Sequence, residues 1–191
     1  MKRRITSGLV GACCLVLTSP AMAGVSLSLE PSATIVTVGN AFSVDVRVSG
    51  LPSPGSPSIG AYFIDLSFTE VLLSPTVVVF PGPPTAGLDL GIFGSLRFAD
   101  FPAPGILHLD EVSLELPDAL VAMQPSDFTL ATVWFDPIAV GVAPLQFDYV
   151  SLSDETGFEE IQTDLIPTTI SIVPEPRLAG VTVGLALFGF H

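Results

Sequence analysis

Beyond its first residues, the sequence has almost no cysteine, lysine or histidine. Both cysteines, Cys13 and Cys14, lie near the N-terminus, the single lysine is Lys2, and the two histidines are His108 and the terminal His191. Without cysteine, the body of the chain can form no disulfide framework and has no thiol nucleophile. A zinc site needs three or four nitrogen or sulfur ligands, which this chain does not supply.

Basic residues are also scarce. The chain has 6 lysines and arginines against 19 acids, and half of the bases fall in residues 2–4. A chain that begins at Gly24 keeps three arginines and all 19 acids, which gives a formal charge of −16. Such a surface repels phosphate backbones and anionic lipids, so the sequence excludes nucleic-acid binding and disfavours anionic membrane surfaces. We interpret the acidity as a source of solubility outside the cell.

Catalytic motifs are missing as well. The chain contains no G-x-S-x-G turn for a serine nucleophile. His108 alternates with Asp110, which is typical of a solvent-facing strand residue, and Glu111 follows on the opposite face, so Asp110 and Glu111 form no glycosidase pair. We predict that the protein is not an enzyme. A sandwich-fold hydrolase whose carboxylate pair the sequence does not mark is a minor alternative.

The first 23 residues have the three parts of a secretory signal peptide. A basic start at residues 2–4 precedes an apolar stretch at 9–17, and Ala21 and Ala23 form an A-x-A cleavage site. We expect cleavage after Ala23. Lipoprotein processing at Cys13 is the alternative, because the residues before it loosely match a lipobox.

Residues 24–173 show the alternation of apolar and polar side chains that is typical of half-buried strands. Loops rich in proline, glycine and serine, such as residues 51–57, separate the alternating segments. Many short strands with turn signals indicate one all-β domain, a jelly-roll or Ig-like β-sandwich. We expect about nine strands, near residues 25–30, 33–38, 41–49, 59–69, 76–80, 106–116, 127–136, 144–153 and 168–173.

The same alternation predicts part of the core and its irregularities. After Tyr149 the apolar phase slips to Val150 and Leu152, which predicts a bulge or a bend. Residues 81–105 contain five prolines and are expected to form a long connection. The one helical signal is a turn near Asp118–Met123. One sheet face should bury Phe42, Val44, Val46, Tyr62, Ile64, Leu66 and Phe68.

The end of the chain combines a short motif with an apolar run. Pro174, Glu175 and Pro176 precede residues 178–190, which are nearly all small or apolar. As a helix this run would be about 20 Å long, shorter than the roughly 30 Å hydrocarbon layer of a bilayer. The run is too short to span a membrane alone, and a loosely packed apolar terminus is one interpretation.

Residues 174–191 also resemble the PEP-CTERM sorting signal of Gram-negative bacteria. In that family, Pro-Glu-Pro precedes a transmembrane helix and an arginine cluster, and the membrane transpeptidase exosortase acts there. This chain departs from the pattern, because no basic cluster follows its apolar run. The resemblance implies an exosortase-type partner, transient membrane association through the tail, and a final place at the cell surface or in exopolysaccharide.

The order of segments in the middle of the chain is similar to that of cohesin domains. The matching segments are Ser28–Pro31, Val36–Val46, Gly60–Phe68, Phe128–Phe135 and Pro144–Phe147. The resemblance implies a nine-stranded jelly-roll sandwich, related to carbohydrate-binding modules, that binds rather than catalyses. Cohesins bind calcium-loaded dockerin modules through one sheet face, so it also implies a dockerin-like protein or a polysaccharide as partner. An acidic structural matrix protein without a specific ligand is the alternative.

An acidic segment is the candidate for metal binding. Its carboxylates surround a glycine, a composition that suits calcium; they are Asp154, Glu155, Glu159 and Glu160. The EF-hand spacing is absent, and a solvated acidic loop is the alternative. We expect no other cofactor.

Two aromatic residues are candidates for stacking on a sugar. Alternation turns Phe63 away from the face of Tyr62, and it places Phe135 and Trp134 on opposite faces, so that one of these two is exposed. Of that pair we select Phe135. The alternative for Phe63 and Phe135 is burial in the second sheet or under the long connection.

Overall fold

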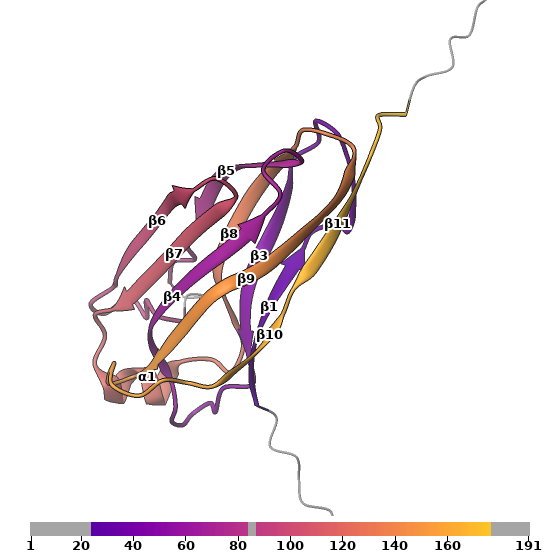
Figure 1. The fold of residues 1–191 in the computed structure, drawn as a ribbon. Helices are drawn as coiled ribbons and strands as arrows, with labels where there is room; N and C mark the ends of the chain where they lie inside the picture. Colours follow the sequence, from indigo (N-terminus) through magenta and orange to yellow (C-terminus); the bar gives the residue numbers. More distant parts are fainter. Residues whose placement is uncertain (1–23, 84–86, 177–191) are drawn as a thin grey trace, which may run out of the picture.

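Two β-sheets packed face to face make up the protein in the computed structural model, which describes residues 24–83 and 87–176 (Figure 1). The predicted signal peptide with Ala21 and Ala23, and the tail beyond Pro176, lie outside the described residues. The fold class is the all-β sandwich that the alternation predicts.

The first sheet has five strands in the order β10-β1-β3-β8-β5. β1 and β10 run parallel, and the other neighbours are antiparallel. The strands are β1 (Val25–Pro31), β3 (Phe42–Ser49), β5 (Leu73–Val79), β8 (Phe128–Pro137) and β10 (Thr163–Ile166).

The second sheet has six strands in the order β2-β11-β9-β4-β7-β6. β2 and β11 are parallel, and a short helix, α1 (Pro117–Met123), links β7 to β8 and so joins the two sheets. The strands are β2 (Ile35–Thr37), β4 (Ile59–Phe68), β6 (Ser95–Ala103), β7 (Ile106–Ser113), β9 (Gly141–Asp154) and β11 (Thr168–Val173).

The core lies between the two sheets and follows the predicted alternation. In β3 every second residue from Phe42 is buried, and the residues between them are partly exposed. All members of the predicted face series are buried except Phe68, which is half-buried and packs against the core. The phase assigned to β3 and β4 is therefore confirmed.

The predicted bulge in β9 is also present. Tyr149 lies opposite Asp65 of β4, whereas Phe147 lies opposite Leu66, so Asp148 is an extra residue on the β9 side. Two residues against one is the definition of a bulge, and it moves the apolar phase from Phe147 to Val150.

Two strands of the described part were not predicted. β6 lies inside residues 81–105, which were expected to be a connection, and β10 precedes Pro167. Both are edge strands, where a missing N–H is tolerated, so Pro102 within β6 does not prevent pairing. The predicted turn near Asp118–Met123 is a helix that begins at Pro117, the position where proline is favoured.

The hairpin between β6 and β7 turns at Pro104-Gly105 and is tied to the neighbouring strand β4. Gly105 has φ of 73°, in the left-handed region, and its carbonyl oxygen accepts a hydrogen bond of 2.8 Å from the Phe68 N–H. A Cβ at Gly105 would lie 2.8 Å from the Phe68 carbonyl oxygen, so only glycine fits both the dihedral and the contact.

The described chain begins and finishes at opposite ends of the sandwich, with β1 starting at the lower end of Figure 1 and β11 finishing at the upper end. No helix in residues 24–83 and 87–176 is long and apolar enough to cross a membrane.

Candidate functional site

The outer face of four adjacent strands, β9, β4, β7 and β6, gathers the polar and aromatic side chains that point away from the core. We call it the outer face of the six-stranded sheet. Cross-strand pairing places His108 of β7 between Asp65 of β4 and Asp100 of β6, with Tyr149 of β9 beyond Asp65. In the next row, Asp110 lies between Phe63 and Phe98.

His108 forms the centre of this face. Its Nδ1 atom lies 2.5 Å from Oδ1 of Asp65, and its Nε2 atom lies 3.5 Å from Oδ2 of Asp110. The hydrogen bond to Asp65 raises the pKa of His108, the attraction of both carboxylates adds to it, and partial burial opposes it. The predicted outward-pointing histidine is therefore present, but two carboxylates hold it and it is only partly exposed.

Apolar side chains surround this polar centre. The ring of Phe98 lies 6.5 Å from the imidazole of His108, centroid to centroid. Exposed apolar residues near this centre are Phe63, Leu96, Phe98, Val112 and Tyr149, and the same strands also expose Phe101 and Val142. Leu96 lies opposite Val112, and Phe98 and Phe63 flank Asp110, so the exposed groups are contiguous. A contiguous exposed apolar surface around a few charges is typical of a protein-binding face.

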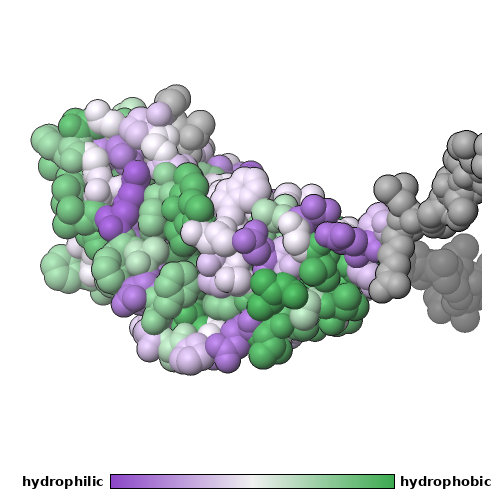
Figure 2. Space-filling view, turned by 90° about the horizontal axis from the view of Figure 1, so that it is seen from above, coloured by the Kyte–Doolittle hydropathy of each residue, from purple (hydrophilic) through white to green (hydrophobic). Residues whose placement is uncertain are grey.

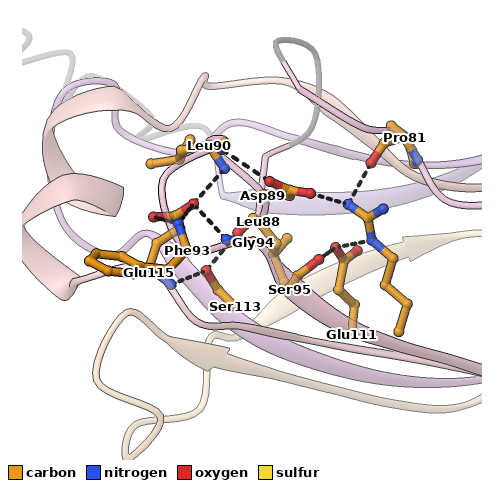
Figure 3. A network of polar contacts seen from close by, with 12 residues as sticks. Pro81, Leu88, Asp89, Leu90, Phe93, Gly94, Ser95, Glu111, Ser113 and Glu115 are labelled. Carbon is orange, nitrogen blue, oxygen red and sulfur yellow. Dashed lines mark hydrogen bonds and ion pairs between the residues drawn. The ribbon is translucent and has the colours of Figure 1, made fainter.

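A buried polar network fixes the edge strand β6, which carries Leu96 and Phe98 (Figure 3). Arg97 points inward, and its Nε donates to Oε1 of Glu111 at 2.9 Å. One of its terminal nitrogens donates to Oδ2 of Asp89 at 3.0 Å and to the Pro81 carbonyl at 2.8 Å. Ser95 also donates to Glu111. These bonds tie β6 to β7 and to the preceding loop.

A second carboxylate, that of Glu115, organises the loop before β6. It accepts backbone N–H groups of four loop residues, Leu90, Ile92, Phe93 and Gly94. Burial raises the pKa of Glu115, but these hydrogen bonds together outweigh burial and lower the pKa below its ordinary value. The loop that Glu115 organises leads directly into β6, and its residues Ile92 and Phe93 are exposed.

A hollow of about 550 Å³ lies at the upper end of the sandwich, where β6 turns into β7. Apolar residues, Phe101 and Ile138 among them, line much of it, and Figure 2 shows this end as a mixture of apolar and hydrophilic residues. Glu70 is the one titratable residue in its described lining, so the hollow offers no pair of groups for acid–base catalysis.

The structure separates the two aromatic candidates. Phe63 is 38% exposed on the outer face of the six-stranded sheet. Phe135 is fully buried, with its ring stacked on Phe42 at 5.8 Å and edge-on to Phe68 at 5.6 Å, so the prediction that Phe135 stacks on a ligand is wrong. Its neighbour Trp134 is exposed instead.

The four carboxylates proposed for calcium have separate partners in the structure. The Asp154 carboxylate accepts hydrogen bonds from the Thr156 hydroxyl and from the N–H groups of Phe158 and Glu159, which closes its own loop. The Glu155 carboxylate accepts hydrogen bonds from the Ser56 hydroxyl and the Ser58 N–H. The side chains of Glu159 and Glu160 are exposed. Within the described ranges no three acidic or histidine side chains converge as metal ligands. Of the candidate set, Asp154 is buried and bonded within its own loop, Glu155 is bonded to residues 56–58, and Glu159 and Glu160 face solvent.

The candidate sorting motif lies directly after the sandwich. β11 ends at Val173, and Pro174, Glu175 and Pro176 follow it with exposed side chains. The motif is therefore reachable from solvent without unfolding a strand.

Comparison with known proteins identifies the fold. No family model matches the sequence, and no curated protein matches it. Solved structures do match. A type II cohesin domain from the cellulosome of Acetivibrio cellulolyticus superimposes with a TM-score of 0.64 at 18% sequence identity, and the match covers 77% of this chain and 95% of that chain. A non-cellulosomal cohesin from Archaeoglobus fulgidus gives a TM-score of 0.58 at 16% identity, covering 79% and 92%.

A third neighbour is the sixth cohesin of scaffoldin B from Acetivibrio cellulolyticus, solved in complex with a dockerin. It gives a TM-score of 0.61 at 14% identity and covers 78% of this chain and 99% of that one. The protein thus has the cohesin fold, as its segment order implied.

Proposed function

We propose that this protein is an exported, non-enzymatic binding module that recognises a protein partner through the outer face of the six-stranded sheet. The observation that carries the proposal is the contiguous apolar surface around the Asp65–His108–Asp110 cluster. It lies on rigid strands rather than on loops, which suits a preformed docking face.

The chemistry of the face defines the partner. Phe63, Phe98 and Tyr149 offer aromatic contact area, and Asp65 and Asp110 offer two carboxylates near its middle. A partner with apolar side chains and at least one basic group is complementary to it. Since a cohesin neighbour was solved with a dockerin, we propose a dockerin-like module as the partner.

Export and surface sorting complete the proposal. The A-x-A site at Ala21 and Ala23 directs the chain out of the cytoplasm. The exposed Pro174–Pro176 motif is then processed by an exosortase-type enzyme of a Gram-negative cell. The sandwich is thereby displayed at the cell surface or in the exopolysaccharide.

Matched substitutions on the two sheets test the binding face. Phe98 and Val77 are both 52% exposed, but Phe98 lies on the outer face of the six-stranded sheet and Val77 on the other sheet. The full-length exported protein is titrated with a calcium-loaded dockerin module, and in parallel with each purified dockerin-like protein that its host exports. Phe98→Asp should weaken the complex by about tenfold or more, and Val77→Asp should leave the affinity unchanged.

If Phe98→Asp and Val77→Asp lose affinity for the partner equally, the partner does not bind specifically to the outer face of the six-stranded sheet. If none of these partners binds, the protein-binding role is refuted, and the acidic matrix protein without a specific ligand becomes the better interpretation.

A further inference from the structure

The outer face of the five-stranded sheet carries a separate groove on the opposite side of the sandwich. It measures about 580 Å³ and lies over β3, β8 and the end of β5. Its lining includes Arg47, Val79, Asp127, Thr129 and Thr132. None of these residues belongs to the protein-binding face described above.

A bulge in β8 creates the polar floor of this groove. Asp45 pairs with Thr132 and Arg47 pairs with Thr129, which leaves an extra residue on β8 between the two pairs. Leu130 and Ala131 are both buried, and Thr129 and Thr132 consequently share the outer face although they are three residues apart. Bulges re-aim side chains in this way, and the result is a row of two hydroxyls beside a guanidinium.

Hydrogen-bonding groups of both kinds remain open along the groove. The one contact of the Arg47 guanidinium in the described part of the chain is a 3.9 Å approach to Glu30 at the surface, so most of its N–H donors face solvent. Thr132 donates to Asp45 at 2.6 Å, which leaves the hydroxyl oxygen of Thr132 and the second carboxylate oxygen of Asp45 as acceptors. The groove can therefore pair with groups that both donate and accept.

An aromatic platform continues the groove along β8. Trp134 lies two residues beyond Thr132 on the same face and is 40% exposed. Val77, in register on the edge strand, lies beside it and is exposed. From Thr129 to Trp134 the row extends for roughly 13 Å at the usual rise of a strand, longer than one sugar ring.

We propose that this groove binds a neutral polysaccharide. A pyranose ring has an apolar C–H face, which stacks on Trp134 and Val77, and a rim of hydroxyl groups that both donate and accept, which pair with Arg47, Asp45 and Thr132. Asp127 lines the groove with Arg47, Glu30 approaches the same guanidinium, and Asp45 lies two residues before Arg47 on the outer face of β3. The local charge therefore disfavours polymers rich in carboxylates or sulfates. The site extends the binding role of the module to a second, independent ligand.

The single tryptophan of the chain makes the test direct. Trp134 is the only tryptophan, so its fluorescence reports on this groove alone. The full-length exported protein is titrated with hydroxyethyl cellulose, with the neutral fraction of its host's exopolysaccharide, and with alginate as the anionic control. We expect a blue shift and protection from acrylamide quenching with at least one neutral polymer and none with alginate; the polymer that binds identifies the source of the ligand.

Variants then assign the contact. In affinity electrophoresis, Trp134→Ala should weaken binding by about tenfold or more, and Arg47→Ala by a smaller factor, since both side chains are partly exposed and their removal leaves the fold intact. Phe98→Asp, on the opposite sheet, should bind the polysaccharide unchanged while losing the protein partner. Failure of both neutral polymers, stronger binding of alginate, or full affinity in a folded Trp134→Ala variant would overturn the proposal without affecting the protein-binding face.

Discussion

Replacing Arg97 with methionine should test the network that holds β6 in place. Arg97 is the counter-charge of Glu111, whose side chain is only 3% exposed, and it also binds Asp89. Methionine keeps most of the apolar stem of arginine, so the main change is loss of the charge and of three hydrogen bonds. Glu111 then remains buried with only hydroxyl donors, from Ser95 and Tyr62.

The magnitude follows from the burial of the two partners. Breaking a fully buried ion pair costs about 3–5 kcal/mol, because one charge is left without compensation. The Arg97 side chain is 25% exposed, so water screens part of this loss and we expect about 2–4 kcal/mol of destabilisation. The double variant Arg97→Met with Glu111→Gln removes the stranded charge and should recover about 1–2 kcal/mol of that loss.

Urea unfolding at pH 7, followed by far-ultraviolet circular dichroism, measures these differences for the wild type and both variants. The reasoning is refuted if Arg97→Met costs less than about 1 kcal/mol, or if the double variant is no more stable than the single one. In the first case the guanidinium contributes packing alone, and in the second the buried charge of Glu111 is not the source of the instability.

Three further perturbations have defined outcomes. Leu66→Ala should cost about 2–5 kcal/mol in urea unfolding, since Leu66 is fully buried between the sheets; a loss below about 0.5 kcal/mol would contradict its place in the core. The pKa of His108 is raised in the folded state, so its contribution to the unfolding free energy is fully present below pH 6.5, the unfolded value, and is lost as the pH rises through the folded pKa. His108→Gln should remove this pH dependence of the unfolding free energy. Deletion of residues 174–191, or Glu175→Ala, should change how the protein partitions between membrane, cell surface and medium in a host with the sorting enzyme. Identical fractionation of the wild type and both variants would show that the tail is not a sorting signal.

The register of β8 shows why the sequence could predict the fold better than the sites. Trp134 and Phe135 are both aromatic, and alternation alone says only that one of them faces the core. The bulge at Leu130 and Ala131 shifts the phase of the strand by one residue and buries Phe135. The sequence marks that shift only by the adjacent apolar residues Leu130 and Ala131 and by two threonines three residues apart, and simple alternation does not use this signal. Phe135 was therefore the wrong choice of the two aromatic residues.

The cluster at His108 depended on information that no local pattern contains. Asp65 lies 43 residues before His108 and meets it only through the pairing of β4 with β7. Phe98 lies in a strand that the prolines of residues 81–105 concealed, although Leu96 and Phe98 do alternate with Ser95 and Arg97. Alternation thus predicted which residues point outward, and cross-strand register, which depends on the whole sheet, determined which of them meet.

The opposite exits of the chain also determine how the protein responds to mechanical force. A load applied between residue 24 and residue 176 pulls β1 and β11 in opposite directions along their own axes (Figure 1). The backbone hydrogen bonds of β1 with β3 and β10, and those of β11 with β2 and β9, lie across that direction and are therefore sheared together rather than opened one at a time. A module held by its C-terminal end and pulled from its N-terminal end would resist extension with many bonds at once, which suits the surface display proposed above.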